Sequence, residues 1–409
     1  MDITINELGQ LTPDSYILLD MRGDVEVGHG IIPGAIHMSK EEILEKYSGG
    51  LVKADEAEAA EREDSAEKKL IIYCARGRIS QELAEELRDR GYDAYSLKGG
   101  YTSWLLNEMK NQQADEVCAQ VEKSIRKKFR KNIWCKFTKA INQYELVKDF
   151  LPNVEYDELS HIIKIEKTEK EHIGKISGGK DSMLMAKLFQ ELKLHNKFPF
   201  EVKFVVMDPG YSPENRKVIE ENARKLKIPI HIFESDIFES VYHIEKSPCY
   251  LCARMRRGYL YNFAKELGCN KIALGHHYDD VIETILMGML YGAQIQTMMP
   301  KLHSTNFEGM ELIRPLYLIR EDDIKAWRDY NDLRFIQCAC KFTDTCTTCN
   351  NEENQSKRVE IKQLIAEIKK KNPYVEAHIF KSVENVNIET VIAYKKDGVK
   401  HHFLDNYDL

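Results

Sequence analysis

The 409-residue sequence lacks long hydrophobic runs, internal repeats and an excess of positive charge. No apolar stretch approaches the roughly 20 residues that a membrane span requires, and no signal peptide precedes the first predicted strand. We therefore expect a cytoplasmic protein with no membrane partner. The net charge of −7 gives no support for nucleic-acid binding by the chain as a whole, so any such surface must be local.

The sequence also lacks the even spread of cysteines that a disulfide framework needs, although it contains ten of them. They cluster as CxxC and CxC pairs, which is typical of metal or sulfur chemistry in a reducing compartment. Hydrophobic residues make up 43% of the chain and charged residues 31%, as in a soluble globular protein. The length exceeds what a single core supports and predicts two or three domains.

The stretch KLIIYCARGRIS (69–80) places a thiol between a strand and a helix. Its apolar part predicts a buried strand, and a helical pattern begins at Ser80. Backbone N–H groups and a helix N-terminus favour an anion at this point, so they would stabilise the thiolate of Cys74. The alternative is a packed core cysteine. Two arginines and a glycine directly after the cysteine favour the reactive interpretation.

This loop belongs to a series of four motifs that resembles the rhodanese domain in order and spacing, up to about residue 108. The motifs are ILLDMR (17–22), GHGIIPGAIHMS (28–39), the Cys74 loop and LKGGYTSW (97–104). The resemblance implies that Cys74 carries a persulfide in a six-residue loop of amides. Ile79 stands where that family usually has a basic residue. Residues 55–67 contain seven acids and are expected to form a solvated loop inserted before the active strand.

A polar stretch at 111–116 is the expected linker, and a strongly basic segment follows it at 121–143. Apolar residues recur every four positions in this segment, which predicts a helix with one packed face. A single-sign stripe favours contact with the phosphate backbone of a nucleic acid over a merely solvated helix. The apolar residues are Ile125, Phe129, Ile133 and Phe137, and the positive ones are Lys123, Arg126, Lys127, Lys128, Arg130, Lys131, Lys136 and Lys139, against Glu122 alone.

A second anion-binding loop lies in HIGKISGGKDSMLMAKL (172–188). Glycines between a strand and a helix let the backbone approach a phosphate closely. The loop is not the GxxxxGK[ST] P-loop. It matches SGGxDS, the PP-loop of ATP pyrophosphatases, which hydrolyse ATP between the α- and β-phosphates and adenylate a substrate. The predicted ATP-binding residues are Ser177, Gly178, Gly179, Lys180, Asp181 and Ser182.

The strands predicted at 200–210 and 228–234 alternate with helices, which is the pattern of a doubly wound parallel sheet with nucleotides at its carboxyl edge. Further on, KIALGHHYDD ends a strand with two histidines and two carboxylates. Asp279 or Asp280 could hold Mg²⁺ or accept a proton during attack on the base. For His276 and His277, packing within the loop is an equal alternative.

The combination of SGGKDS, CxxCARxRRG, KIALGHHxDD and IRPL (313–316) resembles the tRNA 2-thiocytidine synthases over about residues 121–380. The resemblance implies ATP and a [4Fe–4S] cluster held by three cysteines, of which Cys249 and Cys252 are two. It also implies that Gly275 and His276 belong to the nucleotide site, and that Arg256 lies near nucleotide and cluster.

The third cluster ligand is sought in IQCACKFTDTCTTCNN (336–351), which offers Cys338, Cys340, Cys346 and Cys349. Counting from IRPL favours Cys340, with Cys349 second. Alternatively, these four cysteines bind a structural Zn²⁺.

Together these patterns predict an α/β protein with an N-terminal rhodanese domain (1–110), a linker and basic tRNA-binding segment (111–165), and a doubly wound PP-loop domain resembling the adenine nucleotide α-hydrolases (166–409). A cysteine desulfurase or thiosulfate would load Cys74, the cluster would receive the sulfur, and sulfur would displace AMP from the adenylated base. Cys74, Arg256 and Asp280 are the expected catalytic residues, and a homodimer is the expected assembly. A 2-thiouridine synthase, a small-molecule sulfurtransferase and a non-catalytic sensor of persulfide and nucleotide are the alternatives.

Overall fold

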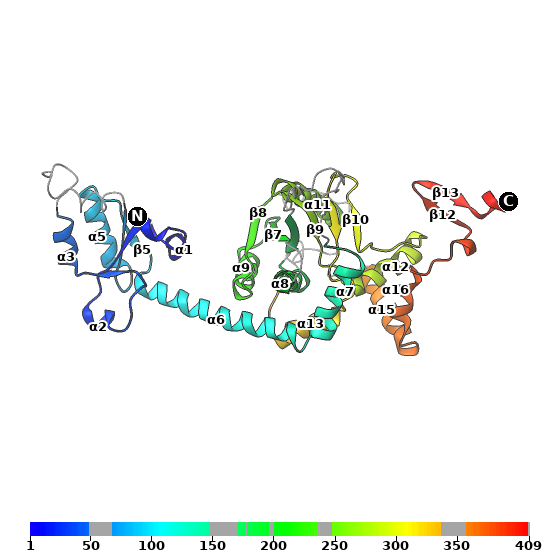
Figure 1. Ribbon diagram of the computed structural model, residues 1–409, viewed down its shortest axis with the longest axis horizontal. Helices are drawn as coiled ribbons and strands as arrows, with labels where there is room; N and C mark the ends of the chain where they lie inside the picture. The colour runs from blue at the N-terminus through cyan, green and yellow to red at the C-terminus, as the bar shows by residue number, and fades with distance from the viewer. Residues whose placement is uncertain are drawn as a thin grey trace, which may run out of the picture. The chain divides into compact units, whose positions relative to one another are not determined.

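The computed structural model describes residues 1–48, 68–147, 171–176, 178–195, 200–235, 237, 248–336 and 357–407. Of residues 171–176, 248–254 and 406 it describes the backbone only. The chain divides into two compact units, Met1–Ala114 and Asp115–Leu409 (Figure 1). The acidic stretch predicted as a loop at 55–67 lies outside the described residues. In the part of the chain described, no helix has the length and apolar character needed to cross a membrane.

The first unit contains a five-stranded sheet in the order β1-β5-β4-β2-β3. All adjacent strands are parallel. The strands are β1 (Asp2–Ile3), β2 (Tyr16–Asp20), β3 (Ile36–His37), β4 (Lys69–Tyr73) and β5 (Ala94–Leu97), and the helices are α1 (Ile5–Leu8), α2 (Asp24–Val27), α3 (Lys40–Lys46) and α5 (Arg78–Asp89) with the 3₁₀ turn η1 (Pro13–Ser15).

Both faces of this sheet are covered, because successive side chains of a strand point to opposite faces. Leu70 and Ile72 of β4 pack with α5 and α3, whereas Ile71 and Tyr73 pack with α1 and the start of α6. The continuous apolar run in the sequence therefore becomes the central strand of a parallel sheet, with the cysteine loop directly at its carboxyl end.

Helix α6 (Gly100–Arg126) is continuous and extends from the first unit into the second. The polar stretch 111–116 that was expected as a linker lies inside this helix. It contains neither glycine nor proline, and Ala114, Cys118 and Val121 are buried at helical spacing. The polar composition of residues 111–116 suggested a linker, whereas the helical spacing of these buried residues indicates a helix.

The second unit contains a six-stranded sheet in the order β10-β11-β9-β6-β7-β8, in which only β10 and β11 are antiparallel. The strands are β6 (Glu171–Ile176), β7 (Glu201–Asp208), β8 (Ile230–Glu234), β9 (Cys269–Ala273), β10 (Lys301–His303) and β11 (Glu311–Ile313), and the helices around them are α8 (Lys180–His195), α9 (Pro213–Lys225), α11 (Pro248–Glu266), α12 (Tyr278–Gly292) and α13 (Glu321–Tyr330).

This sheet is wound on both sides. Phe204 and Val206 of β7 belong to the core that contains α8, whereas Val205 packs with α11 on the other face. The chain proceeds from β6 to β7 and β8 on one side and then returns to β9 on the other side of β6. The crevice between the carboxyl ends of β6 and β9 is therefore the topological switch point, where ligands bind in such folds.

The basic segment packs as predicted, since Ile125, Phe129, Ile133 and Phe137 are all buried. It is not one regular helix: a π-helical turn η2 (Arg130–Trp134) separates α6 from α7 (Cys135–Gln143). The chain ends with α15 (Lys357–Lys371), α16 (Val375–Ser382), the 3₁₀ turns η5 (Ile388–Thr390) and η6 (Phe403–Asn406), and a hairpin of β12 (Ala393–Lys396) and β13 (Val399–His402).

Candidate functional sites

Cys74 lies at the carboxyl end of β4 and is buried. Its Sγ accepts a hydrogen bond from the backbone N–H of Gly77 at 3.1 Å and one from the Ser80 hydroxyl at 3.5 Å. Burial is the largest single influence on the thiol and raises its pKa. The hydrogen bonds from the Ser80 side chain and from the amides of Ser80, Arg76 and Gly77 together outweigh it, so the pKa of Cys74 is lowered.

The loop after Cys74 is held by the GGYTS stretch that opens α6. The N–H of Tyr101 donates to the carbonyl oxygen of Cys74 at 2.9 Å, and the N–H of Thr102 donates to that of Ala75 at 3.0 Å. Gly100 has φ +59°, and a Cβ at this position would collide with the Cys74 carbonyl. Gly100 therefore allows a second backbone segment to approach the sulfur loop.

A buried charged network that was not predicted from the sequence supports this loop. Arg22 Nη2 lies 2.6 Å from Asp20 Oδ2, and the Tyr73 hydroxyl donates to the same oxygen at 2.8 Å. The Arg22 guanidinium stacks over the Tyr101 ring with its Cζ 3.6 Å from the centroid. The network ties β2 and β4 to the start of α6. In the sequence, the sign of this network was the acid and the arginine that stand two residues apart in ILLDMR.

The PP-loop leads from β6 into α8, which begins at Lys180. Gly178 has φ +76°, a conformation that favours glycine. Lys180 Nζ lies 3.1 Å from Asp181 Oδ2 and 3.3 Å from Glu321 Oε1. Asp181 Oδ1 is buried and has no hydrogen-bond partner among the described residues. Ser177, predicted as the first residue of the loop, lies outside the described residues.

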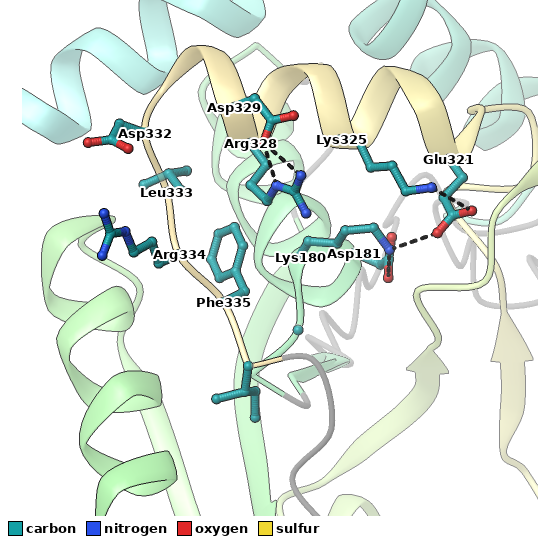
Figure 2. A pocket seen from close by; sticks show the side chains of 12 residues that line it. Lys180, Asp181, Glu321, Lys325, Arg328, Asp329, Asp332, Leu333, Arg334 and Phe335 are labelled. Carbon is teal, nitrogen blue, oxygen red and sulfur yellow. Dashed lines mark hydrogen bonds and ion pairs between the residues drawn. The ribbon is translucent and has the colours of Figure 1, made fainter. Parts of the chain in front are cut away.

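Gly275, which follows β9, lies directly against this loop. A Cβ at Gly275 would lie 3.4 Å from the Cβ of Asp181 and 3.4 Å from the backbone N of Ser182. The two motifs SGGKDS and GHHYDD therefore meet at the switch point. Beside them lies a charged cavity of about 780 Å³, lined by Gly179, Lys180, Asp181 and residues of α13 and the segment after it (Figure 2).

The residues that follow Gly275 have structural partners. His277 is buried, precedes α12 and caps it: Asp280 N lies 3.4 Å from His277 Nδ1, and Asp280 Oδ2 accepts from His277 N at 3.0 Å. Asp280 Oδ1 lies 3.2 Å from Arg358 Nη1. The structure therefore supports the packing interpretation for His277.

The second carboxylate of the motif has a different set of partners. Asp279 accepts two hydrogen bonds from the guanidinium of Arg320, at 2.8 and 3.1 Å through Oδ1, and one from the N–H of Glu321 at 2.7 Å through Oδ2. These contacts fix the start of α13 against α12. No sequence motif pointed to Arg320, because it lies 41 residues from Asp279.

Arg256 on α11 donates through Nη2 to the Tyr211 hydroxyl at 3.2 Å. Its Nε is buried without a hydrogen-bond partner in the described part of the chain. Tyr211 follows β7, where Asp208 Oδ1 accepts from the N–H groups of Gly210 and Tyr211. Arg256 is thereby linked to the carboxyl end of the neighbouring strand β7.

Cys249 and Cys252 lie in the first turn of α11, where a spacing of three residues places both on one face of the helix. Their side chains are not among those described, and Cys338, Cys340, Cys346 and Cys349 lie outside the described residues. Among the side chains that are described, no group of three or more His, Cys, Asp or Glu is arranged to hold a metal ion.

The basic segment offers fewer free charges than its sequence suggests. Arg126 lies 2.7 Å from the buried Glu191, and Lys136 lies 3.3 Å from Asp323. Lys128 stacks on Tyr330, with Nζ 3.7 Å from the ring centroid. The remaining cations are exposed and form no ion pair with the residues described: Lys123, Lys127, Arg130, Lys131 and Lys139.

Comparison with known families accounts for both sites. A family model described as a PP-loop domain matches residues 151–345, and one described as a rhodanese-like domain matches residues 4–107. The fold and the two sites thus define a sulfurtransferase in which a rhodanese-like domain is joined to an ATP-binding PP-loop domain.

Relatives identify the family. The tRNA-cytidine(32) 2-sulfurtransferase of Vibrio parahaemolyticus is 37% identical over 220 residues, which are 52% of this chain and 69% of that protein. The enzymes of the same name from Chromohalobacter salexigens and Pseudomonas fluorescens are each 36% identical, over 52% of this chain and 72% and 74% of their own lengths. The chain belongs to the tRNA-cytidine(32) 2-sulfurtransferase family. The predicted family, fold class and enzyme class are confirmed.

Two solved structures resemble parts of the chain. The U34-tRNA thiolase NcsA from Methanococcus maripaludis with its [4Fe-4S] cluster has a TM-score of 0.44 and 20% identity, over 63% of this chain and 80% of that chain. A rhodanese-like domain protein from Staphylococcus aureus has a TM-score of 0.20 and 26% identity, over 25% of this chain and 91% of that chain.

Proposed function

We propose that the protein catalyses ATP-dependent thiolation of tRNA, replacing the 2-oxygen of a cytidine with sulfur that is first carried on Cys74. One observation carries this proposal. A loop that stabilises a thiolate and a PP-loop at the switch point of a nucleotide-binding sheet occur in one chain. The names of the relatives supply the substrate class, a cytidine in tRNA.

The rhodanese-like domain is proposed to hold the sulfur. The amide and hydroxyl donors around Cys74 favour the thiolate, which attacks the sulfur of a donor such as a cysteine desulfurase persulfide or thiosulfate. The same donors then stabilise the anionic persulfide. Carrying this group on the chain that consumes it raises its effective concentration and confines a reactive species.

The PP-loop domain is proposed to activate the base. The 2-oxygen of the cytidine would attack the α-phosphate of ATP, which releases pyrophosphate and converts the oxygen into part of a leaving group, AMP. The loop from Ser177 to Ser182 is expected to cradle the phosphates through its amides, with Gly275 giving the room for close approach. Asp181 Oδ1 is buried and has no hydrogen-bond partner among the described residues, so we expect it to make a polar contact when the nucleotide binds.

Arg256 and Asp280 are proposed to act at the same edge of the sheet. The Nε of Arg256 is buried without a hydrogen-bond partner among the described residues, and we propose that it donates to a phosphate or to the base when the substrates bind. Asp280 is proposed to accept a proton or bind Mg²⁺, exchanging Arg358 for that partner at Oδ1. His276 lies beside Gly275 in the same loop and is proposed as a nucleotide contact.

The cysteines suit an iron–sulfur cluster, because Cys249 and Cys252 share one helix face and a third thiolate is available at Cys340 or a neighbour. When bound, a [4Fe–4S] cluster held by three cysteines supplies an iron with an open position for sulfur. Protein purified without air should contain about four iron and four sulfide ions per chain, and Cys252→Ala should lose both. Stoichiometric zinc in place of iron would contradict this assignment.

The outer sulfur of the persulfide must gain two electrons to become the thiocarbonyl sulfur, and a thiol reductant supplies them as it is oxidised to a disulfide. The function is therefore tested by incubating the anaerobic protein with ATP, a persulfide donor, a thiol reductant and tRNA from a strain that lacks the gene. We expect 2-thiocytidine in the digested tRNA and AMP and pyrophosphate in the supernatant, and neither with Asp181→Ala. Formation of 2-thiouridine would identify a different base, and product formation without tRNA would identify a small-molecule substrate. Absence of ATP cleavage under all conditions would contradict the proposal.

A further inference from the structure

The cavity beside the PP-loop is only partly explained by the sequence motifs. SGGKDS contributes Gly179, Lys180 and Asp181, whereas the rest of the lining comes from α13 and residues 331–336. Charged side chains dominate the lining (Figure 2). A charged cavity of about 780 Å³ next to a phosphate loop suits the polyphosphate part of a nucleotide better than its base.

Helix α13 directs two cations toward this cavity. Lys325 and Arg328 are three residues apart and therefore neighbours on one face of the helix. In Figure 2 the Arg328 guanidinium reaches from α13 toward the space above Lys180, whereas Asp332 points away from that space. The side chains of Lys325 and Arg328 are 43% and 31% exposed, so both are accessible to a ligand.

Three ammonium groups converge on one carboxylate at the start of α13. Lys180, Lys325 and Lys362 all lie 3.2 to 3.3 Å from the carboxylate of Glu321. Burial is the largest influence on Glu321, but these lysines overcome it and lower its pKa to about 2. Each lysine also has a second carboxylate partner: Asp181 for Lys180 at 3.1 Å, Asp322 for Lys325 at 4.0 Å and Glu283 for Lys362 at 3.6 Å. The second partner of Lys325 is distant and 85% exposed, so a phosphate in the cavity can take its place.

Arg328 is held only weakly. Its partner Asp329, 2.7 Å away, is 63% exposed. An ion pair at such an exposed position contributes little to stability. A phosphate can therefore replace Asp329 at little cost, and the planar guanidinium can bind two phosphate oxygens at once.

We propose that Lys325 and Arg328 bind the β- and γ-phosphates of ATP and hold the pyrophosphate as it leaves. This inference rests on the proposed function. In adenylation, the bond from the cytidine oxygen to the α-phosphorus forms while the bond from that phosphorus to the α,β-bridging oxygen breaks. The electron pair of the broken bond passes to the pyrophosphate, so negative charge develops next to the two cations, which stabilise it.

The test is isothermal titration of the full chain with inorganic pyrophosphate and Mg²⁺, and separately with AMP. Lys325→Gln and Arg328→Gln should each raise the dissociation constant of pyrophosphate about tenfold, as expected for the loss of one charge-assisted contact. Affinity for AMP should not change. Arg328→Lys keeps the charge and should lose less affinity, and Lys370→Gln, at an exposed position near the end of α15, should lose none.

The possible outcomes separate this inference from the function on which it rests. Pyrophosphate affinities of Lys325→Gln and Arg328→Gln equal to that of the wild type would overturn the inference alone. A parallel loss of AMP affinity would also overturn it, because the two cations would then support the site as a whole. Failure of the wild-type protein to bind pyrophosphate would overturn the proposed function together with the inference.

Discussion

Arg126 at the end of α6 provides the sharpest test of how the basic segment is held on the second unit. Its Nε lies 2.7 Å from Glu191 Oε2 and its Nη2 lies 2.8 Å from Glu191 Oε1. The Glu191 side chain is 1% exposed, whereas that of Arg126 is 46% exposed. Among the described residues, Arg126→Ala would leave this buried carboxylate with the ring of His195, 3.7 Å away, as its remaining partner for positive charge.

The expected cost lies between two limits. Removing one partner of a fully buried ion pair costs about 3 to 5 kcal/mol, and breaking an exposed pair costs about 1 kcal/mol or less. Since the carboxylate is buried and the guanidinium is half exposed, we expect Arg126→Ala to lower the free energy of unfolding by about 2 kcal/mol. The exposed neighbour Lys127 is the matched control, and Lys127→Ala should change the free energy of unfolding by less than about 0.5 kcal/mol.

The assay is denaturant unfolding followed by tryptophan fluorescence. Trp134 reports on this region, because its ring centroid is 6.2 Å from that of His195. Glu191→Gln removes the buried charge, so Arg126→Ala should cost much less in that background. Equal stability of Arg126→Ala and Lys127→Ala would refute the reasoning and show that Glu191 does not depend on its arginine.

Three further predictions concern other parts of the chain. Ser80→Ala removes a hydrogen bond to the Cys74 thiolate, so its pKa should rise and the pH profile of alkylation by iodoacetamide should move to higher pH; an unchanged profile would contradict the assigned role. Replacing Lys127 and Lys131 by alanine should weaken tRNA binding and reduce its salt dependence, and an unchanged slope would exclude this surface. Burial raises the pKa of Glu283 from 4.5 to about 7, so the folded state holds its proton more tightly than the unfolded state does. The free energy of unfolding should therefore fall by about 3 kcal/mol as the pH rises from 4.5 to about 7, and Glu283→Gln should remove this fall. A wild-type pH profile of unfolding in Glu283→Gln would contradict this prediction.

The sequence was sufficient where the chemistry is local. The Cys74 loop, the PP-loop and the packed face that includes Ile125 depend on residues close together in the chain, where periodicity, glycine and helix starts carry the information. The parallel direction of most strands in the second sheet also followed from the alternation of strands and helices, because parallel neighbours need a helical crossover between them.

The sequence was insufficient where a side chain depends on a distant partner. Asp279 and Asp280 resemble open catalytic carboxylates in GHHYDD, yet they contact Arg320 and Arg358, which are 41 and 78 residues away. Arg126 resembles a free phosphate ligand and is instead paired with Glu191, 65 residues away. Pairings of this kind depend on how helices pack, and no local pattern encodes them.

Sulfur transfer through Cys74 is tested most directly by measuring thionucleoside yield with two sulfur sources. Cys74→Ser should abolish thiolation of tRNA supported by a protein persulfide or thiosulfate, because thiol–persulfide exchange needs the stabilised thiolate. It should leave thiolation with free sulfide largely intact, whereas Asp181→Ala should abolish thiolation from every source. Loss of the sulfide-supported yield in Cys74→Ser would contradict this account, because Cys74 would then act in the thiolation step and not only in delivering sulfur.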